Sequence, residues 1–132
     1  MVVSRGHLHK PAELPAFIAI EEQEPRGIIT WQETDDNWEI VTVDAFDRRQ
    51  GVGIALMAAL EAHARSNGCR RLWLVTTNDN LDALRFYQRR GYRLVELHAN
   101  ALAHSRQLKP SIPLIGDYCI PIRDELVLDK LL

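Results

Sequence analysis

The sequence predicts a mixed α/β fold in one domain, because strand-like runs come first and helical stretches then alternate with strands. Three short runs rich in β-favouring residues lie at 16–20, 27–31 and 38–43. Residues 51–67 are then mostly strong helix formers with apolar side chains at helical spacing. A chain of 132 residues can bury one core without disulfides or metal, so residues 1–132 are expected to form a single domain.

The first three runs predict an antiparallel meander, because only short polar connections separate them. Residues 21–26 and the turn at 35–37 supply those connections. In the third run, strict alternation would place Glu39, Val41 and Val43 on one face of the strand.

The second half of the chain reads as helices alternating with strands. Gly68 is a natural stop for the first helix. Residues 72–75 (LWLV) form a continuous apolar run, which is typical of a strand covered on both faces. The remaining elements are expected as a helix over 81–90, a strand over 92–97, a helix over 99–108 and a strand over 120–128.

The composition argues against several classes of protein. Sixteen basic against eighteen acidic residues disfavour a nucleic-acid binder. Two cysteines without a CxxC pair disfavour a disulfide scaffold or a thiolate zinc site, and fit a reducing cytosol. His7 and His9 lack an evident third ligand, so we expect a flexible terminus and no metal. Without a signal peptide or a membrane-length apolar run, the chain is expected to be cytoplasmic and free of membrane contact.

A glycine-containing loop, called the phosphate loop below, separates the third strand from the first helix. It consists of Arg48, Arg49, Gln50, Gly51, Val52 and Gly53. Glycine lets backbone amides approach a ligand, and a helix start presents unpaired N–H groups with a partial positive charge. The amides of the last four residues are therefore expected to hold a diphosphate, with the two arginines adding charge.

Other interpretations of the phosphate loop stay open on its residues alone. It could be a plain strand-to-helix turn. A Walker loop would need a lysine after its last glycine, and a dinucleotide fingerprint would need a third glycine where Leu56 stands.

A second pattern falls on the second helix, as Asn80, Ala83, Phe86, Tyr87, Gly91 and Tyr92. Ala83, Phe86 and Tyr87 share one helical face. Phe86 is read as a core residue. Tyr87 differs because its hydroxyl needs a partner or water when buried.

With both patterns in place, the chain resembles the GNAT superfamily of N-acetyltransferases over residues 15–98. The first family signature, [RQ]-x-x-G-x-[GA], is matched by Arg48, Gly51 and Gly53. The second, N-x-x-A-x-x-[FY]-Y-x-x-x-G-[FY], is matched by the pattern from Asn80 to Tyr92. Residues 108–110 and 120–125 also look like the tail of a bacterial subgroup whose substrate is unassigned.

The resemblance implies acetyl-CoA as co-substrate and assigns roles to single residues. The Val43 backbone amide would face the thioester oxygen, Asn80 would contact the cofactor arm, and Tyr87 would face the sulfur as general acid. Glu39 is the candidate base, although the reading as an exposed strand carboxylate is favoured over that role. Asp44 and His98 are weaker alternatives.

The implied function is transfer of an acetyl group to a primary amine of a small molecule or peptide. The alternative is a non-catalytic acyl-CoA-binding module or subunit, and a nucleotide-binding domain is a weaker third. The meander begins within the first twenty residues, which leaves no room for the N-terminal strand and two helices that the resemblance implies. We expect either a truncated chain or a partner subunit that supplies this wall of the acceptor pocket. We therefore expect a homodimer in which apolar side chains of the first strands, such as Phe17, Ile18, Ile20 and Trp31, cover the partner's acceptor side.

Overall fold

The computed structural model describes residues 1–46 and 51–132, which divide into two compact units. The meander unit contains residues 10–72 with Leu131–Leu132, and the C-terminal unit contains residues 1–9 and 73–130. Both units combine helices with strands, so the predicted mixed α/β fold is confirmed. The assignment of residues 1–132 to a single domain stays a prediction.

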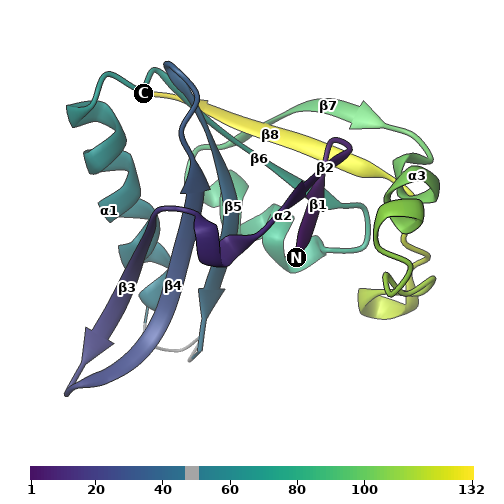
Figure 1. The fold of residues 1–132 in the computed structure, drawn as a ribbon, viewed down its shortest axis with the longest axis horizontal. Coiled ribbons are helices and arrows are strands. Elements are labelled where there is room, and N and C mark those ends of the chain that lie inside the picture. Colours follow the sequence, from purple (N-terminus) through teal and green to yellow (C-terminus); the bar gives the residue numbers. More distant parts are fainter. Residues whose placement is uncertain (47–50) are drawn as a thin grey trace. The chain divides into compact units, whose positions relative to one another are not determined.

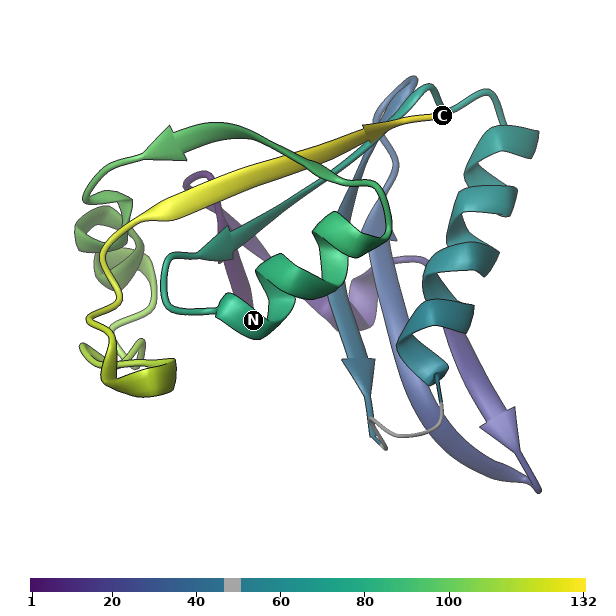
Figure 2. The same cartoon turned by 180° about the vertical axis from the view of Figure 1, so that it is seen from behind.

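Three antiparallel strands and one long helix build the meander unit. They are β3 (Ala16–Glu21), β4 (Glu24–Gln32), β5 (Asn37–Ala45) and α1 (Val52–Ser66), with a short 3-10 helix at Pro11–Glu13. Strand β4 pairs with β3 on one side and β5 on the other. Figures 1 and 2 show α1 lying along one face of this meander.

The connection between β3 and β4 is shorter than the sequence predicts. It consists of Glu22 and Gln23, whose φ values of 53° and 66° are both positive. Two central residues with positive φ are typical of a type I′ hairpin turn, which matches the twist of the flanking strands. Pro25 was expected in the connection but belongs to β4, where it lies opposite Ile20.

Aromatic side chains fill the core of the meander unit where the strands meet α1. Trp31 stacks on Trp38 with ring centroids 6.4 Å apart, and Phe17 lies 4.9 Å from Trp31. His63 of α1 contacts all three rings. Trp31 and Trp38 are therefore buried, and Phe17 is half-buried against α1. Phe17 and Trp31 were expected on an exposed patch, and that expectation is wrong.

The C-terminal unit contains the alternating second half of the chain. Its elements are β6 (Arg71–Thr77, of which 73–77 lie in this unit), α2 (Leu81–Arg89), β7 (Arg93–His98), α3 (Ala101–Leu108), a 3-10 helix at Asp117–Cys119 and β8 (Glu125–Leu131). Strand β8 lies between β6 and β7, as Figure 2 shows, and pairs antiparallel with β7. The strand that comes last in the sequence thus lies between two strands that precede it.

The first nine residues form a hairpin, which is called the N-terminal hairpin below. Strands β1 (Val2–Ser4) and β2 (His7–His9) pair antiparallel and can be followed from the N-terminus in Figure 1. The loop residues Arg5 and Gly6 both have positive φ, as a type I′ turn requires. The expected flexible terminus is wrong, and His9 is buried.

Candidate functional site

The predicted site residues belong to both compact units. Val43, Glu39 and the phosphate loop lie in the meander unit, whereas Asn80 and Tyr87 lie in the C-terminal unit. Within the phosphate loop, the predicted ligands Arg48, Arg49 and Gln50 fall outside the described residues, and the other three are described.

Gly51 is the N-cap of α1 and has a left-handed backbone, with φ 67° and ψ 18°. Its carbonyl accepts the first helical hydrogen bond, from the amide of Ala55 at 3.1 Å. A Cβ built on Gly51 would meet nothing within 4 Å, so the space beside its backbone is open. The amides of Val52, Gly53 and Ile54 follow at the first turn, where a helix provides no internal acceptor. This end of α1 can therefore offer amides and a partial positive charge to an anion.

A β-bulge in β5 changes which side chains share a face. Thr42 lies opposite Thr30 and Ile40 lies opposite Trp31, so Val41 has no partner in β4. Residues that pair across two strands point to the same face of the sheet. Because the bulge adds one unpaired residue to β5, side chains before and after it do not follow a single in-and-out alternation.

The bulge separates Glu39 from the face that carries Val43. Val43 pairs with Ile29 on the Trp31 side of β4, whereas Glu39 pairs with Gln32 on the opposite side. The expectation that Glu39 and Val43 lie on one face is therefore wrong. The reading of Glu39 as an exposed carboxylate is also wrong, because the residue is only 7% exposed. Its role as a base stays a prediction.

Val41 is a site candidate that the sequence reasoning missed. A bulged residue is unpaired in the local ladder, and bulges re-aim backbone and side chains near active sites. Val41 lies two residues before Val43, whose amide was the predicted oxyanion donor. The sequence around Val41 has no glycine or other signal of a bulge, so only the pairing register of β4 and β5 could reveal the bulge.

Three polar residues after β6 perform separate tasks. The Asn80 side chain accepts a hydrogen bond from the Ala83 amide at 3.3 Å, which caps α2 as predicted. Asp79 is buried and accepts hydrogen bonds from Thr77 and from the Asp117 amide, at 2.5 Å and 2.9 Å. Gly116 passes so close that a Cβ there would overlap the Asp79 carboxylate. The turn thus positions both the start of α2 and a distant C-terminal segment.

Asn78 ties the same turn to the residues before β8. Its side chain donates to the Pro121 carbonyl and accepts from the amides of Arg123 and Asp124, all within 3.0 Å. These contacts bridge more than forty residues of sequence, so local reasoning identified only the capping role.

Tyr87 lies in an aromatic group on α2. Its ring makes edge contacts with Phe86 at 5.3 Å and with Tyr92 at 5.9 Å, and Arg90 lies over the Phe86 ring. Burial removes water from the hydroxyl and raises the pKa of Tyr87 to about 12. The hydroxyl is therefore protonated at neutral pH, so it can donate a hydrogen bond but cannot act as a base.

The raised pKa of Tyr87 predicts a specific loss of stability at alkaline pH. Below pH 10 the hydroxyl is protonated in both the folded and the unfolded chain, so stability is unaffected. Between pH 10 and 12 only the unfolded chain ionises, so the free energy of unfolding falls by at most about 1.4 kcal/mol per pH unit. Urea unfolding from pH 8 to 11.5 measures this slope. Tyr87→Phe should flatten it relative to the wild type, and parallel curves for the two proteins would contradict the assignment.

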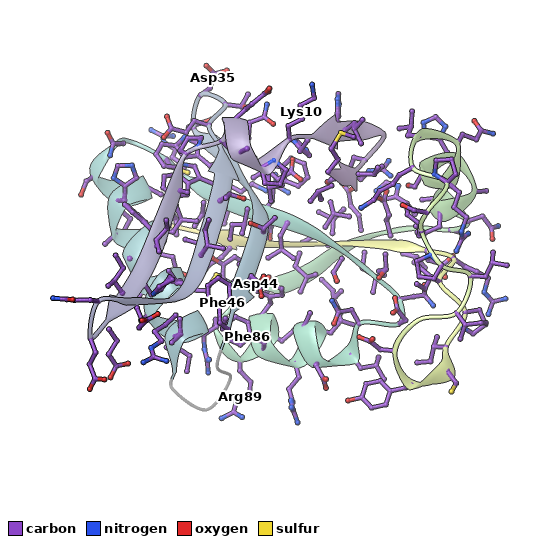
Figure 3. The ribbon with its side chains drawn as sticks, turned by 60° about the horizontal axis from the view of Figure 1, so that its bottom comes forward. Lys10, Asp35, Asp44, Phe46, Phe86 and Arg89 are labelled. Atoms are coloured by element: carbon purple, nitrogen blue, oxygen red, sulfur yellow. The ribbon has the colours of Figure 1, made fainter. Side chains whose placement is uncertain are left out.

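Basic side chains gather on and after α2. Arg85, Arg89 and Arg93 are exposed. Figure 3 shows Phe86 and Arg89 on α2, with the Arg89 side chain directed away from the ribbon. Exposed guanidinium groups of this kind suit a phosphate ligand.

Residues 1–46 and 51–132 contain neither a metal-binding cluster nor a membrane-spanning helix. No group of three or more His, Cys, Asp or Glu side chains there is arranged to hold a metal ion. None of the helices in that part of the chain is long and apolar enough to cross a membrane.

The sequence profile of the acetyltransferase (GNAT) family matches residues 3–92. The chain is also 41% identical over 131 residues to the uncharacterized protein YxbD of Bacillus subtilis, covering 98% of this chain and 82% of that protein.

Solved acetyltransferase structures share the fold. A GNAT family acetyltransferase from Elizabethkingia anophelis with acetyl-CoA bound matches with a TM-score of 0.79 at 19% identity, over 92% of this chain and 78% of that one. A Bacillus subtilis acetyltransferase in complex with CoA matches with a TM-score of 0.75 at 21% identity, over 89% and 76% of the two chains.

Proposed function

Because the chain belongs to the acetyltransferase (GNAT) family, we propose that it transfers an acetyl group from acetyl-CoA to a primary amine. The observation that carries the proposal is the left-handed Gly51 at the exposed start of α1, where open backbone amides suit a diphosphate. Structures of similar fold hold CoA or acetyl-CoA, which supports acetyl-CoA as co-substrate.

The cofactor would be held by residues of both signatures. In the phosphate loop, the amides from Gln50 to Gly53 bind the diphosphate and Arg48 and Arg49 add charge. Val43, together with the bulged Val41, supplies backbone amides toward the thioester oxygen, where negative charge develops. Asn80 uses its carbonyl oxygen to cap α2, which leaves its amide nitrogen for the cofactor arm.

The reaction forms a C–N bond and breaks a C–S bond. The protonated amine first loses one proton, and the neutral amine then attacks the thioester carbon. The tetrahedral intermediate expels the CoA thiolate, and the nitrogen releases a second proton, which the thiolate takes up. The protonated amine and acetyl-CoA thus give the amide, free CoA thiol and one proton. Tyr87 donates its hydroxyl hydrogen toward the departing sulfur.

The pKa values of the thiol and the amine show which of the two proton transfers costs more free energy. Releasing a thiol of pKa about 8.5 as thiolate at pH 7 costs roughly 2 kcal/mol. Deprotonating an amine of pKa about 10.4 costs roughly 4.6 kcal/mol at the same pH. For a lysine-like amine, removal of the amine proton is therefore the larger requirement, and buried Glu39 is the residue of the meander unit that we propose for it.

A panel of amines tests the proposed function. Each amine is incubated with acetyl-CoA and the protein, and free thiol is measured over time. Thiol release that depends on both the amine and the protein supports an enzyme. If acetyl-CoA binds but no primary amine in a panel of amino acids, polyamines, peptides and aminoglycosides releases thiol, the proposal of an amine acetyltransferase is wrong.

We also propose a homodimer formed through the exposed face of β3. Ile18 and Ile20 are 55% and 68% exposed on this strand, on the side away from the aromatic core. A second copy would cover them, because two-fold pairing is the commonest closed symmetry. The protein would work in the cytoplasm, where its free cysteines stay reduced.

Light scattering tests the dimer. Ile18→Asp should convert a dimer into a monomer, because a charge placed in an apolar interface loses its hydration. Leu97→Asp, at a 64% exposed position on β7, is the matched control and should leave the mass unchanged. A wild-type protein that is monomeric at all concentrations would contradict this proposal.

A further inference from the structure

The C-terminal unit contains a cavity of about 240 Å³, and the N-terminal hairpin forms one of its walls. Val2 and Val3 of the hairpin line it together with Leu102 of α3. The opposite walls come from β6 and from the segment between α3 and β8. Their lining residues are Val75, Thr76, Thr77, Ile112 and Ile122.

Polar contacts hold the hairpin in place over this cavity. The Arg5 guanidinium donates to Glu125 Oε1 at 2.8 Å, and the Arg5 amide donates to Oε2 at 3.3 Å. Lys109 Nζ donates to the Met1 carbonyl at 2.7 Å. On the other side of the turn, Gly6 lies against the His104 ring. The wall is therefore anchored at the start of the hairpin and at its turn.

Two opposite charges stand at a cavity that is otherwise largely apolar. Glu125 and Lys109 both line it, and Glu125 is only 2% exposed. An ionised carboxylate has about four acceptor sites, and Arg5 occupies two of them. Glu125 can therefore accept a further hydrogen bond from a cationic ligand, and Lys109 has donors for an anionic one.

The cavity adjoins the turn that starts α2. Thr77, one of its lining residues, is followed directly by Asn78, which also holds the backbone on both sides of Ile122. Two residues later Asn80 caps the helix that carries Tyr87. One short turn thus positions both the cavity wall and the proposed acid.

We propose that this cavity is the acceptor site and that it takes a small aliphatic amino acid. The ammonium group would bind Glu125, the carboxylate would bind Lys109, and the aliphatic side chain would contact Leu102, Ile112 and Val3. Its volume lies below the roughly 300 Å³ at which pockets for drug-sized ligands begin, which suits a small amino acid. This inference rests on the proposed acetyl transfer and names its substrate class.

Calorimetry with three probes tests the two charge contacts separately. L-Leucine carries both charges, 3-methylbutylamine lacks the carboxylate and 4-methylpentanoate lacks the ammonium. We expect L-leucine to bind at least tenfold more tightly than either partial ligand. Glu125→Gln should weaken L-leucine and the amine at least tenfold and leave 4-methylpentanoate unchanged. Lys109→Gln should weaken L-leucine and 4-methylpentanoate and leave the amine unchanged.

Arg5→Lys is the matched control for the hairpin, because it replaces the guanidinium contact but keeps a cation beside the buried Glu125 carboxylate. We expect this variant to bind L-leucine within about threefold of wild type. If it loses as much affinity as Glu125→Gln, Glu125 serves only to hold the hairpin and the inference is wrong. The same conclusion follows if acetyl-CoA raises the melting temperature but millimolar L-leucine does not bind. Failure of acetyl-CoA itself to bind would instead overturn the proposed function.

Discussion

Replacing Gly51 by valine should abolish the rise in melting temperature that acetyl-CoA gives to the wild-type protein. At one hundred times its dissociation constant, a ligand of the native state contributes about 2.7 kcal/mol, a shift on the order of 10 °C for a chain of this size. A β-branched side chain at Gly51 would fill the open space beside the first amides of α1 and block the diphosphate. Scanning calorimetry with and without acetyl-CoA measures the effect.

Gly68→Val is the matched control for backbone strain. Gly68 also has a positive φ, of 81°, and a Cβ there would likewise meet nothing within 4 Å. Both variants should therefore lose a similar amount of stability, about 1–2 kcal/mol for a left-handed L-residue. Only the Gly51 variant should lose the response to acetyl-CoA. A full response in Gly51→Val would remove the phosphate loop from the proposed site.

Tyr87→Phe should lower turnover by about ten- to a hundredfold while leaving acetyl-CoA affinity nearly intact. With a pKa of about 12, the hydroxyl cannot pass its proton completely to a thiolate of pKa about 8.5 without a cost of roughly 4.8 kcal/mol. We therefore expect it to stabilise the departing sulfur by a hydrogen bond. For that reason the loss lies at the low end for acid catalysis.

The measurement is single-turnover thiol release, because chemistry must limit the rate. Tyr118→Phe is the control, since Tyr118 is 63% exposed in the same unit and its hydroxyl donates to Asp82 rather than to a ligand. That variant should keep wild-type turnover. Equal rates for wild type and Tyr87→Phe would exclude Tyr87 from the mechanism.

The elements with local signals were predictable from the sequence. The start of α1 after Gly51, the cap of α2 at Asn80 and the strand at β6 all lie within two or three residues of their expected positions. Glycine, a capping amide and an apolar run act on neighbouring backbone, so their effect can be read without knowing the rest of the fold.

Parts of the site that depend on distant pairing could not be predicted. The bulge at Val41 exists only because β5 pairs with β4 in a shifted register, and it moves Glu39 to the other face. The hairpin turn at Arg5 and Gly6 did have a local signal, a glycine in a two-residue loop, which the reading as a flexible terminus overlooked.

The sequence by itself determined the order of the elements and the two signatures of the family, because periodicity, caps and glycines act over a few residues. Only the tertiary structure showed that the first residues of the chain line a cavity together with residues more than one hundred positions away. The Arg5–Glu125 pair spans 120 positions. Such a contact forms only when the whole C-terminal unit has folded, because no local interaction brings the two side chains together.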